Sequence, residues 1–183
     1  TAVCLLLWAA PARSEWDTYT TVDGMLSSSV RCMLEDRSGS IWFGAFNGMS
    51  RYDGRHWRGY IEGDSGLPSN FINMVKARGR VAWVCTDRGL GSVNGDTNRW
   101  VSYVPVDPVW AHRREPFPDD GPMEGTKGWE ARIYDDAKLL KTVKLEKGLA
   151  NNHIYGVDFQ GENVWVATSK GVSLGIWKPE ETR

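Results

Sequence analysis

The stretch Ser29-Val30-Arg31-Cys32-Met33-Leu34-Glu35-Asp36-Arg37-Ser38-Gly39-Ser40-Ile41-Trp42-Phe43-Gly44 decides the fold, because its pattern recurs twice further along the chain. It contains a strand-like run, a polar turn around Gly39 and a second strand-like run rich in aromatic residues. Its tryptophan, Trp42, is followed by Trp83 and Trp165, which are 41 and then 82 residues further on. The same spacing relates the pairs Gly48-Met49, Gly89-Leu90 and Gly171-Val172.

One period predicts four short strands joined by tight turns. After Gly44, the dipeptide Asn47-Gly48 leads into Met49–Tyr52, and Asp53-Gly54 leads into His56–Tyr60. Asn-Gly is a strong hairpin signal, because both central residues of a type I′ turn need positive φ. A period of about 40 residues with four strands is typical of a propeller blade.

Two further copies follow the first. We expect strands over 70–75, 81–86 and 89–93 in the second copy, and over 152–157, 164–168 and 171–174 in the third. Positions 44, 85 and 167 hold Gly, Cys and Ala, which indicates that a neighbouring sheet approaches closely there. The expected fold class is all-β: three recognisable four-stranded repeats of about 41 residues, forming a partial or oligomer-completed β-propeller.

A Trp-x-x-Tyr pair marks the outermost strand of a copy. It occurs as Trp57/Tyr60, as Trp100/Tyr103 and, ahead of the first copy, as Trp16/Tyr19. The third copy runs out at 174–177 without such a pair. Because propellers hide their sheet edges by closure, we expect the N-terminal pair to belong to a last strand whose partners lie elsewhere.

The composite pattern resembles the two-component-regulator type of β-propeller repeat. The stretches that carry the resemblance are Leu34–Asp53, Gly66–Asn70 and Val164–Val172, and the copies together cover most of residues 15–177. The resemblance implies an extracytoplasmic sensor or a secreted module that senses polysaccharide, and for a sensor of this kind we expect a soluble polysaccharide or peptide as ligand. The repeat motif itself is structural and carries no chemistry.

Three copies are fewer than the four to eight blades of a propeller. Three explanations stay open. The chain is a piece of a longer polypeptide, which the lack of an initiating Met favours. Alternatively, two copies complete each other as a six-bladed ring with two-fold symmetry. In the third case, residues 104–148 hide a degenerate blade.

Composition narrows the function class. The 183 residues carry a net charge of −1, so no basic field points to nucleic acid. Residues 1–12 resemble a signal-peptide remnant, with the short apolar run 2–10 and the cleavage-like 10–12, which predicts a mature chain 13–183 in the periplasm or outside the cell. The run is too short to span a membrane. We expect Cys32 and Cys85 to be buried thiols rather than a disulfide.

One segment breaks the repeat. Residues 104–130 contain five prolines between Val104 and Pro122, and we predict an insertion loop there, followed by a strand pair over 131–136 and 139–145. Aromatic and Arg side chains are common anchors of recognition. The candidate ligand- or partner-binding residues are therefore Trp110, Arg113, Arg114 and Trp129 of this segment, with Asn47, Asp87, Arg88 and Lys170 of the blade turns.

No pattern for catalysis, a metal or a cofactor stands out. The three histidines lack metal-site spacing, and His153 takes a strand-opening position that we align with Phe71 and Val30. A hairpin turn explains Asp36 with Ser38 and Ser40 better than a calcium loop does. The sequence favours a recognition or assembly module. The alternatives are a propeller-type lyase or glycosidase, for which Asp119/Asp120 and Asp135/Asp136 are poor acid-base pairs, or a purely structural subunit of an extracellular complex.

Overall fold

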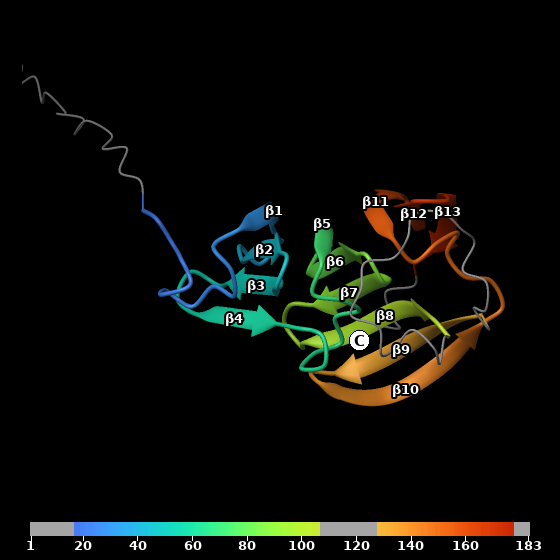
Figure 1. The fold of residues 1–183 in the computed structure, drawn as a ribbon, viewed down its shortest axis with the longest axis horizontal. Helices are drawn as coiled ribbons and strands as arrows, with labels where there is room; N and C mark the ends of the chain where they lie inside the picture. The colour runs from blue at the N-terminus through green and yellow to red at the C-terminus, as the bar shows by residue number, and fades with distance from the viewer. Residues whose placement is uncertain (1–16, 107–127, 178–183) are drawn as a thin grey trace, which may run out of the picture.

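The computed structural model describes residues 17–106 and 128–177, so the segment expected to be a signal peptide and most of the proline-rich stretch lie outside it. The described residues form thirteen β-strands in three antiparallel sheets (Figure 1). They contain no helix, and therefore none long and apolar enough to cross a membrane. Within this part of the chain the three sheets do not close into a ring. The all-β fold built from four-stranded units is confirmed.

The first sheet is one complete blade in the order β1-β2-β3-β4. Its strands are β1 (Val30–Glu35), β2 (Ile41–Ala45), β3 (Gly48–Tyr52) and β4 (Trp57–Tyr60). The hairpin between β2 and β3 lies where Asn47-Gly48 predicted it, but its turn residues are Phe46 and Asn47. Only Gly48 there has positive φ, at 114°, so the type I′ prediction was wrong.

The second sheet has six strands, in the order β10-β9-β8-β7-β6-β5. The four blade strands are β5 (Ile72–Arg78), β6 (Val81–Thr86), β7 (Leu90–Asn94) and β8 (Arg99–Pro105). The hairpin of β9 (Trp129–Asp135) and β10 (Lys138–Leu145) pairs with β8 and widens this sheet. The predicted strand pair is confirmed, and it extends the second blade rather than forming a blade of its own.

The third sheet has three strands within the described residues: β11 (Ile154–Gln160), β12 (Asn163–Thr168) and β13 (Gly171–Ile176). The first strand of the middle sheet, β5, contacts β1 on one side and β11 on the other, so the three first strands lie together (Figure 1). Residues 17–20 form no strand, and Tyr19 packs on Tyr52 and Trp57 of the first sheet. Within residues 17–106 and 128–177, therefore, no strand from the N-terminal side pairs with the outer edge of β13.

Two hydrophobic clusters fill the spaces between the sheets. Trp42, Met49 and Tyr60 of the first sheet pack with residues of the second sheet that include Ile72 and Trp100. Trp83, Cys85 and Leu90 of the second sheet pack with Ile154, Val157, Val164 and Val166 of the third. Most of the free energy from apolar burial therefore lies between the sheets, as expected for units that cannot bury both faces alone.

The close approach predicted at position 44 is confirmed. A Cβ added to Gly44 would lie 2.6 Å from Cγ2 of Ile72 in the next sheet, and the equivalent Cys85 is fully buried. Ala167, at the same position of the third sheet, is exposed because no described sheet follows it. Close packing between sheets thus requires a small residue at this position, and Ala167 is small enough to allow another sheet to pack there.

Candidate functional site

The first strand of every sheet has a β-bulge at the same place. The register shifts between Val30 and Cys32, between Ile72 and Met74, and between Ile154 and Gly156. The extra residues are Arg31, Asn73 and Tyr155. Bulges re-aim side chains and are frequent near functional sites. These pairings also correct our alignment of His153 with Phe71 and Val30. The residue of the first sheet that is equivalent to Phe71 and His153 is Ser29, one residue before Val30. The reason is that β1 and β5 are 42 residues apart in sequence at this point, whereas the tryptophans of β2 and β6 are 41 apart.

The bulge residues tie neighbouring sheets together. Arg31 Nη1 donates to the carbonyl of Ile72 at 3.1 Å and to Asn73 Oδ1 at 3.3 Å. Asn73 Nδ2 in turn donates to the carbonyl of Ile154 at 2.8 Å. In both cases the acceptor is the residue just before the bulge of the next sheet. The same hydrogen bond, from a bulge side chain to a backbone carbonyl of the next sheet, therefore links β1 to β5 and β5 to β11.

Exposed aromatic rings surround this line of bulges. Phe46, in the β2–β3 turn, and Phe71, just before β5, meet edge to face with ring centroids 5.0 Å apart. The guanidinium of Arg31 lies 4.5 Å from the centre of the Phe46 ring. On the third sheet, His153 and the exposed Tyr155 have ring centroids 4.8 Å apart. We call Arg31, Phe46, Phe71, Asn73, His153 and Tyr155 the axial cluster.

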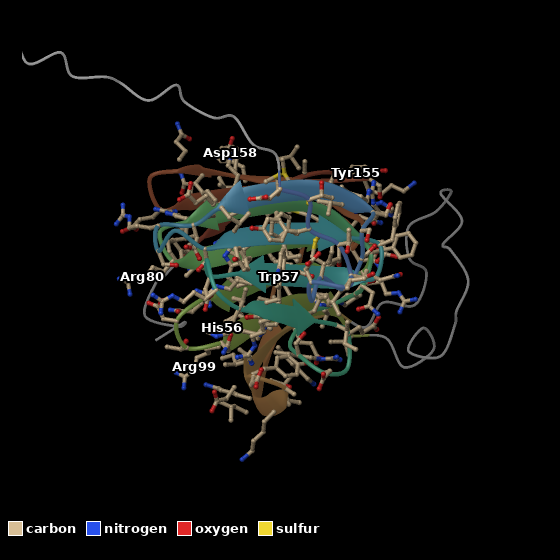
Figure 2. All side chains as sticks on the ribbon, turned by 90° about the vertical axis from the view of Figure 1, so that its left-hand side faces the viewer. His56, Trp57, Arg80, Arg99, Tyr155 and Asp158 are labelled. Atoms are coloured by element: carbon tan, nitrogen blue, oxygen red, sulfur yellow. The ribbon has the colours of Figure 1, made fainter. Side chains whose placement is uncertain are left out.

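The axial cluster lies at one end of the strands. Figure 2 shows Tyr155 at one end of the molecule, with Arg80 and His56 at the other. The turns β2–β3, β6–β7 and β12–β13 are at the Tyr155 end, because their flanking residues pair with the strand starts of β1, β5 and β11. Three sheets thus contribute exposed rings and a cation to one face. Rings and Arg are well suited to stacking on a saccharide or a peptide.

The turn residues predicted as contacts lie on this face. Asn47 is exposed beside Phe46, and Lys170 is exposed in the β12–β13 turn. In the β6–β7 turn, Arg88 Nη1 reaches Glu62 Oε1 of the connection from the first sheet at 3.3 Å. Asp87 next to it is half-buried. The fold therefore brings the four turn residues to one end, and their role in binding stays a prediction.

The insertion residues are placed only in part. Trp129 opens β9, pairs with Pro105 across the sheet and is half-buried, at the same end as the turns. Its indole presses on Gly148, where an added Cβ would overlap the ring. Trp129 therefore has a packing role against Gly148, in addition to being a candidate binding residue. Trp110, Arg113 and Arg114 lie outside the described residues, as does the Asp119/Asp120 doublet.

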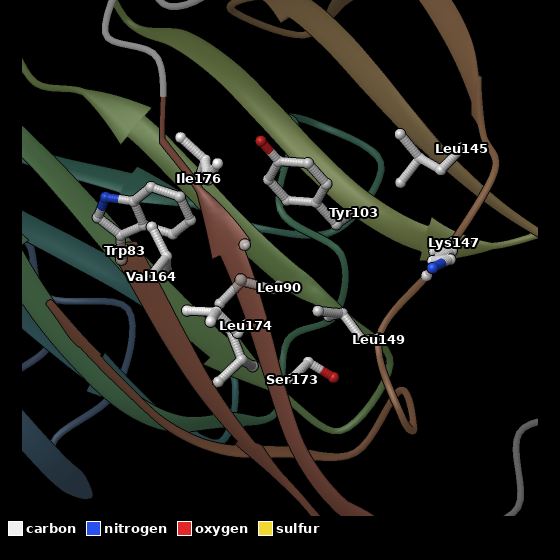
Figure 3. Close-up of a pocket in the computed structure, with 13 residues that line it drawn as sticks. Trp83, Leu90, Tyr103, Leu145, Lys147, Leu149, Val164, Ser173, Leu174 and Ile176 are labelled. Carbon is white, nitrogen blue, oxygen red and sulfur yellow. The ribbon is translucent and has the colours of Figure 1, made fainter. Parts of the chain in front are cut away.

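A cavity of about 240 Å³ lies between the second and third sheets (Figure 3). Trp83, Leu90 and Tyr103 line one side, and Leu149, Val164 and Leu174 belong to the other. Lys147 and Ser173 supply polar atoms at its edge. The lining is mainly apolar, so this cavity suits a hydrophobic side chain better than a charged ligand.

Several carboxylates of the described residues are engaged in turns or ion pairs, whereas one oxygen of Asp87 is buried without a hydrogen-bond partner. Burial of Asp36 acts to raise its pKa, but hydrogen bonds from Ser38, from the Trp42 indole and from the amide of Ser40 outweigh it and leave the pKa below its usual value. The predicted hairpin turn at Asp36 is confirmed. Asp136, in the β9–β10 turn, pairs with Arg58 at 2.8 Å. No group of three metal-ligating side chains occurs in the described ranges.

Both described cysteines are free thiols, as predicted, but only Cys85 is buried. Cys32 is partly exposed, because its sheet face has no described neighbour on every side, so its predicted burial was wrong. Cys85 is fully buried, and desolvation raises its pKa to about 12. Burial is also the main reason that the pKa of Cys32 lies above its usual value. Neither thiol is set up as a nucleophile, because the reactive form is the thiolate.

The sequence reasoning missed most of the axial cluster. It treated His153 as structural and did not include Arg31, Phe46, Phe71, Asn73 or Tyr155 among the candidate binding residues. The available signal was the aromatic residue at the start of successive first strands, Phe71 and His153, together with Phe46 in the preceding turn. That signal is weak by itself, because the bulge that brings these side chains together is visible only in the strand register.

Comparison with known proteins supports the repeat type. Residues 24–47 match the family model of the two component regulator propeller, so the predicted resemblance is confirmed over that stretch. The matched residues run from the connection before β1 through β2 and its turn. No curated protein sequence matches the chain.

Among solved structures, the chain is similar to the extracellular domain of the proposed hybrid two component system BT3049 from B. thetaiotaomicron, at 17% identity and a TM-score of 0.45 over 87% of this chain and 25% of that one. It is also similar to the extracellular domain of the proposed one component system BT4673 from B. thetaiotaomicron, at 21% identity and a TM-score of 0.34 over 80% of this chain and 27% of that one. The chain thus spans about a quarter of each structure.

Proposed function

We propose that this chain is part of an extracytoplasmic recognition propeller of the two-component-regulator type, and that it binds a polysaccharide or peptide over the axial cluster. The observation that carries the proposal is that exposed aromatic rings of three sheets lie at the same end of the strands as Arg31, whose guanidinium contacts the Phe46 ring. The repeat type found at 24–47 adds support, since it predicts a sensor-like module.

The geometry favours binding over chemistry. Phe46 and Phe71 are exposed although both are large and apolar, and their rings stabilise each other through an edge-to-face contact. Arg31 is held by two acceptors from the second sheet, so its cation is preorganised under the Phe46 ring. A preorganised aromatic-cationic surface binds with less loss of conformational freedom.

A lyase or glycosidase would need a carboxyl group with a raised pKa to act as general acid. Among the described residues, the carboxyl groups with a shifted pKa run the other way: hydrogen bonds lower the pKa of Asp36 against the effect of its burial, and hydrogen bonds together with a nearby cation lower the pKa of Asp53 and Asp158. This supports recognition, and a catalytic role is the weaker alternative. A location in the periplasm or outside the cell fits a sensor of polysaccharide, and a protein partner is the other ligand class that this surface suits.

A glycan array and a peptide array probed with the purified chain test the proposal. We expect one class of glycan or peptide to bind on one of the arrays. Arg31→Ala and Phe46→Ala should each lower the affinity for it at least about tenfold. Arg80→Ala and His56→Ala are the matched controls at the opposite end of the strands and should bind as the parent chain does. Trp110→Ala and Arg113→Ala test whether the insertion loop shares the contact.

Two outcomes would reject the proposal. One is the absence of any ligand above background on both arrays. The other is binding that Arg31→Ala and Phe46→Ala leave unchanged while Trp110→Ala and Arg113→Ala remove it, because the site would then be the insertion and not the axial cluster. Circular dichroism of every variant checks that the β-fold is retained.

A further inference from the structure

The outward face of the third sheet repeats a surface that is buried in the other two. We call residues equivalent when strand pairing puts them at the same place in each sheet. Trp42 and Trp83 are 0% and 2% exposed, whereas the equivalent Trp165 is 40% exposed. Met49 and Leu90 are 0% and 2% exposed, whereas the equivalent Val172 is 64% exposed. This face is therefore an inter-sheet surface that no described residue covers.

The cavity beside the third sheet has a counterpart that is filled. Between the first and second sheets, Trp42, Met49 and Tyr60 surround the indole of Trp100, which comes from β8. Their equivalents Trp83, Leu90 and Tyr103 line the cavity of about 240 Å³ (Figure 3). The vacant volume is thus where the tryptophan of a fourth strand would lie, next to the edge strand β13.

The N-terminal stretch already lies on the first sheet in the manner of a preceding fourth strand. The ring of Tyr19 lies 5.7 Å from that of Trp57, and the equivalent pair across the next boundary, Tyr60 and Trp100, is 5.5 Å apart. A Cβ at Gly24 would press on Trp57, as one at Gly66 would press on Trp100. Residues 17–25 therefore occupy the position of a connection between two blades.

A second detail fixes this connection. The amide of Leu26 donates to Ser50 Oγ of the first sheet at 3.0 Å, and the amide of Ala150 donates to the equivalent Ser173 Oγ at 2.8 Å. Ala150 lies in the connection that enters the third sheet. The stretch ahead of β1 is thus held like an inter-blade connection, although no blade of the same chain precedes it in the described residues.

We propose that a second copy of this chain completes the third sheet. The segment around Trp16–Tyr19 of that copy adds as the fourth strand beside β13 and places Trp16 in the cavity. Strands β1–β4 of the same copy then cover Trp165 and Val172. The exchange is reciprocal, so two copies close a ring of six blades with two-fold symmetry and leave neither third sheet with an open edge.

The segment around Trp16–Tyr19 and strands β1–β4 are continuous in sequence. A second copy of the chain can therefore supply both the missing fourth strand and the missing neighbouring sheet, which is why we favour it as the occupant. The first sheet of each copy has an uncovered face of its own: Met33 is exposed, whereas its equivalents Val75 and Val157 are buried. The open face of the first sheet and the open face of the third sheet are therefore complementary. The contact that they would form is of the same kind as the two sheet-to-sheet contacts already present within one chain.

Sedimentation of the full 183-residue chain tests the proposal. We expect a mass of twice 20.5 kDa at micromolar concentration. Trp16→Ala empties the cavity and should raise the dissociation constant roughly thirtyfold or more, since buried tryptophans dominate interface energies. Val172→Asp places a charge on the covered face and should leave only the monomer.

Leu140→Asp is the matched control, because Leu140 is also an exposed apolar residue on a strand but lies on β10. It should sediment as the parent chain does. Near-ultraviolet circular dichroism of the monomeric variants confirms that they remain folded. A parent chain that sediments at 20.5 kDa overturns the proposal. A dimer that both Trp16→Ala and Val172→Asp leave intact overturns it as well.

Discussion

The indole nitrogen of Trp42 donates a 2.8 Å hydrogen bond to the carboxylate of Asp36, and both side chains are buried. The carboxylate also accepts hydrogen bonds from Ser38 and Ser40, so it holds the β1–β2 turn and orients one of the two tryptophans of the first core cluster. One turn residue thus couples a local hairpin to the packing between sheets.

Asp36→Ala should therefore destabilise the fold by about 2 kcal/mol or more, because the Trp42 indole and two turn amides lose their acceptor in a buried place. Urea unfolding followed by tryptophan fluorescence measures the change. Asp53→Ala is the control, because Asp53 accepts hydrogen bonds from two backbone amides in an exposed turn. Its replacement should lower the free energy of unfolding clearly less. Equal effects would contradict a special role for the Asp36–Trp42 pair.

The stability should also fall at acid pH. The pKa of folded Asp36 lies below its unfolded value near 3.8, so its ionised form stabilises the fold above pH 3.8 and this stabilisation is lost as the pH falls further. Asp53 and Asp158 shift in the same direction but are solvent-screened. Thermal melts from pH 7 to 2 should show the main loss below about pH 4, and Asp36→Asn should flatten it.

Gly44→Ala should destabilise the chain by about 1–3 kcal/mol, because the new methyl would lie 2.6 Å from Ile72 Cγ2 and 3.0 Å from Val75 Cγ2. Gly175→Ala is the matched control, since nothing lies within 4 Å of a Cβ at that position. Urea titration of both variants gives the comparison. A tolerated Gly44→Ala would mean that the first two sheets are less closely packed than described.

Cys85 should resist alkylation in the native protein. It is fully buried, and its pKa of about 12 leaves almost no thiolate at neutral pH. Peptide mapping after iodoacetamide treatment should find Cys85 unmodified, whereas the same treatment in guanidinium should modify it completely. Rapid native modification would show that the space between the second and third sheets opens often.

Local sequence signals predicted nearly every strand. Alternating apolar residues around Trp42, Trp83 and Trp165 and the Gly-containing turns between them specify short strands without long-range information. The Asn47-Gly48 signal placed its hairpin correctly and its turn type wrongly, because the strand register put Phe46 and Asn47 in the turn. Short-range preferences locate a turn more reliably than they fix its dihedral angles.

The candidate site was less predictable. Asn47, Asp87, Arg88 and Lys170 come to one end because all lie in turns between the second and third strands of their sheets, which the repeat implied. The axial cluster depends on bulges at Arg31, Asn73 and Tyr155, and a bulge is a property of pairing between two strands. No single segment carries that information.

The amino-acid sequence by itself determined that this protein is built from repeated antiparallel units, since residue alternation and turn chemistry act over a few residues. Only the tertiary structure decided which equivalent side chains are buried. Trp83 is covered and Trp165 is not, although their local sequences agree, because burial depends on whether another sheet lies alongside. The same long-range pairing joined β9 and β10 to the second sheet, since hydrogen bonding to β8 was available there.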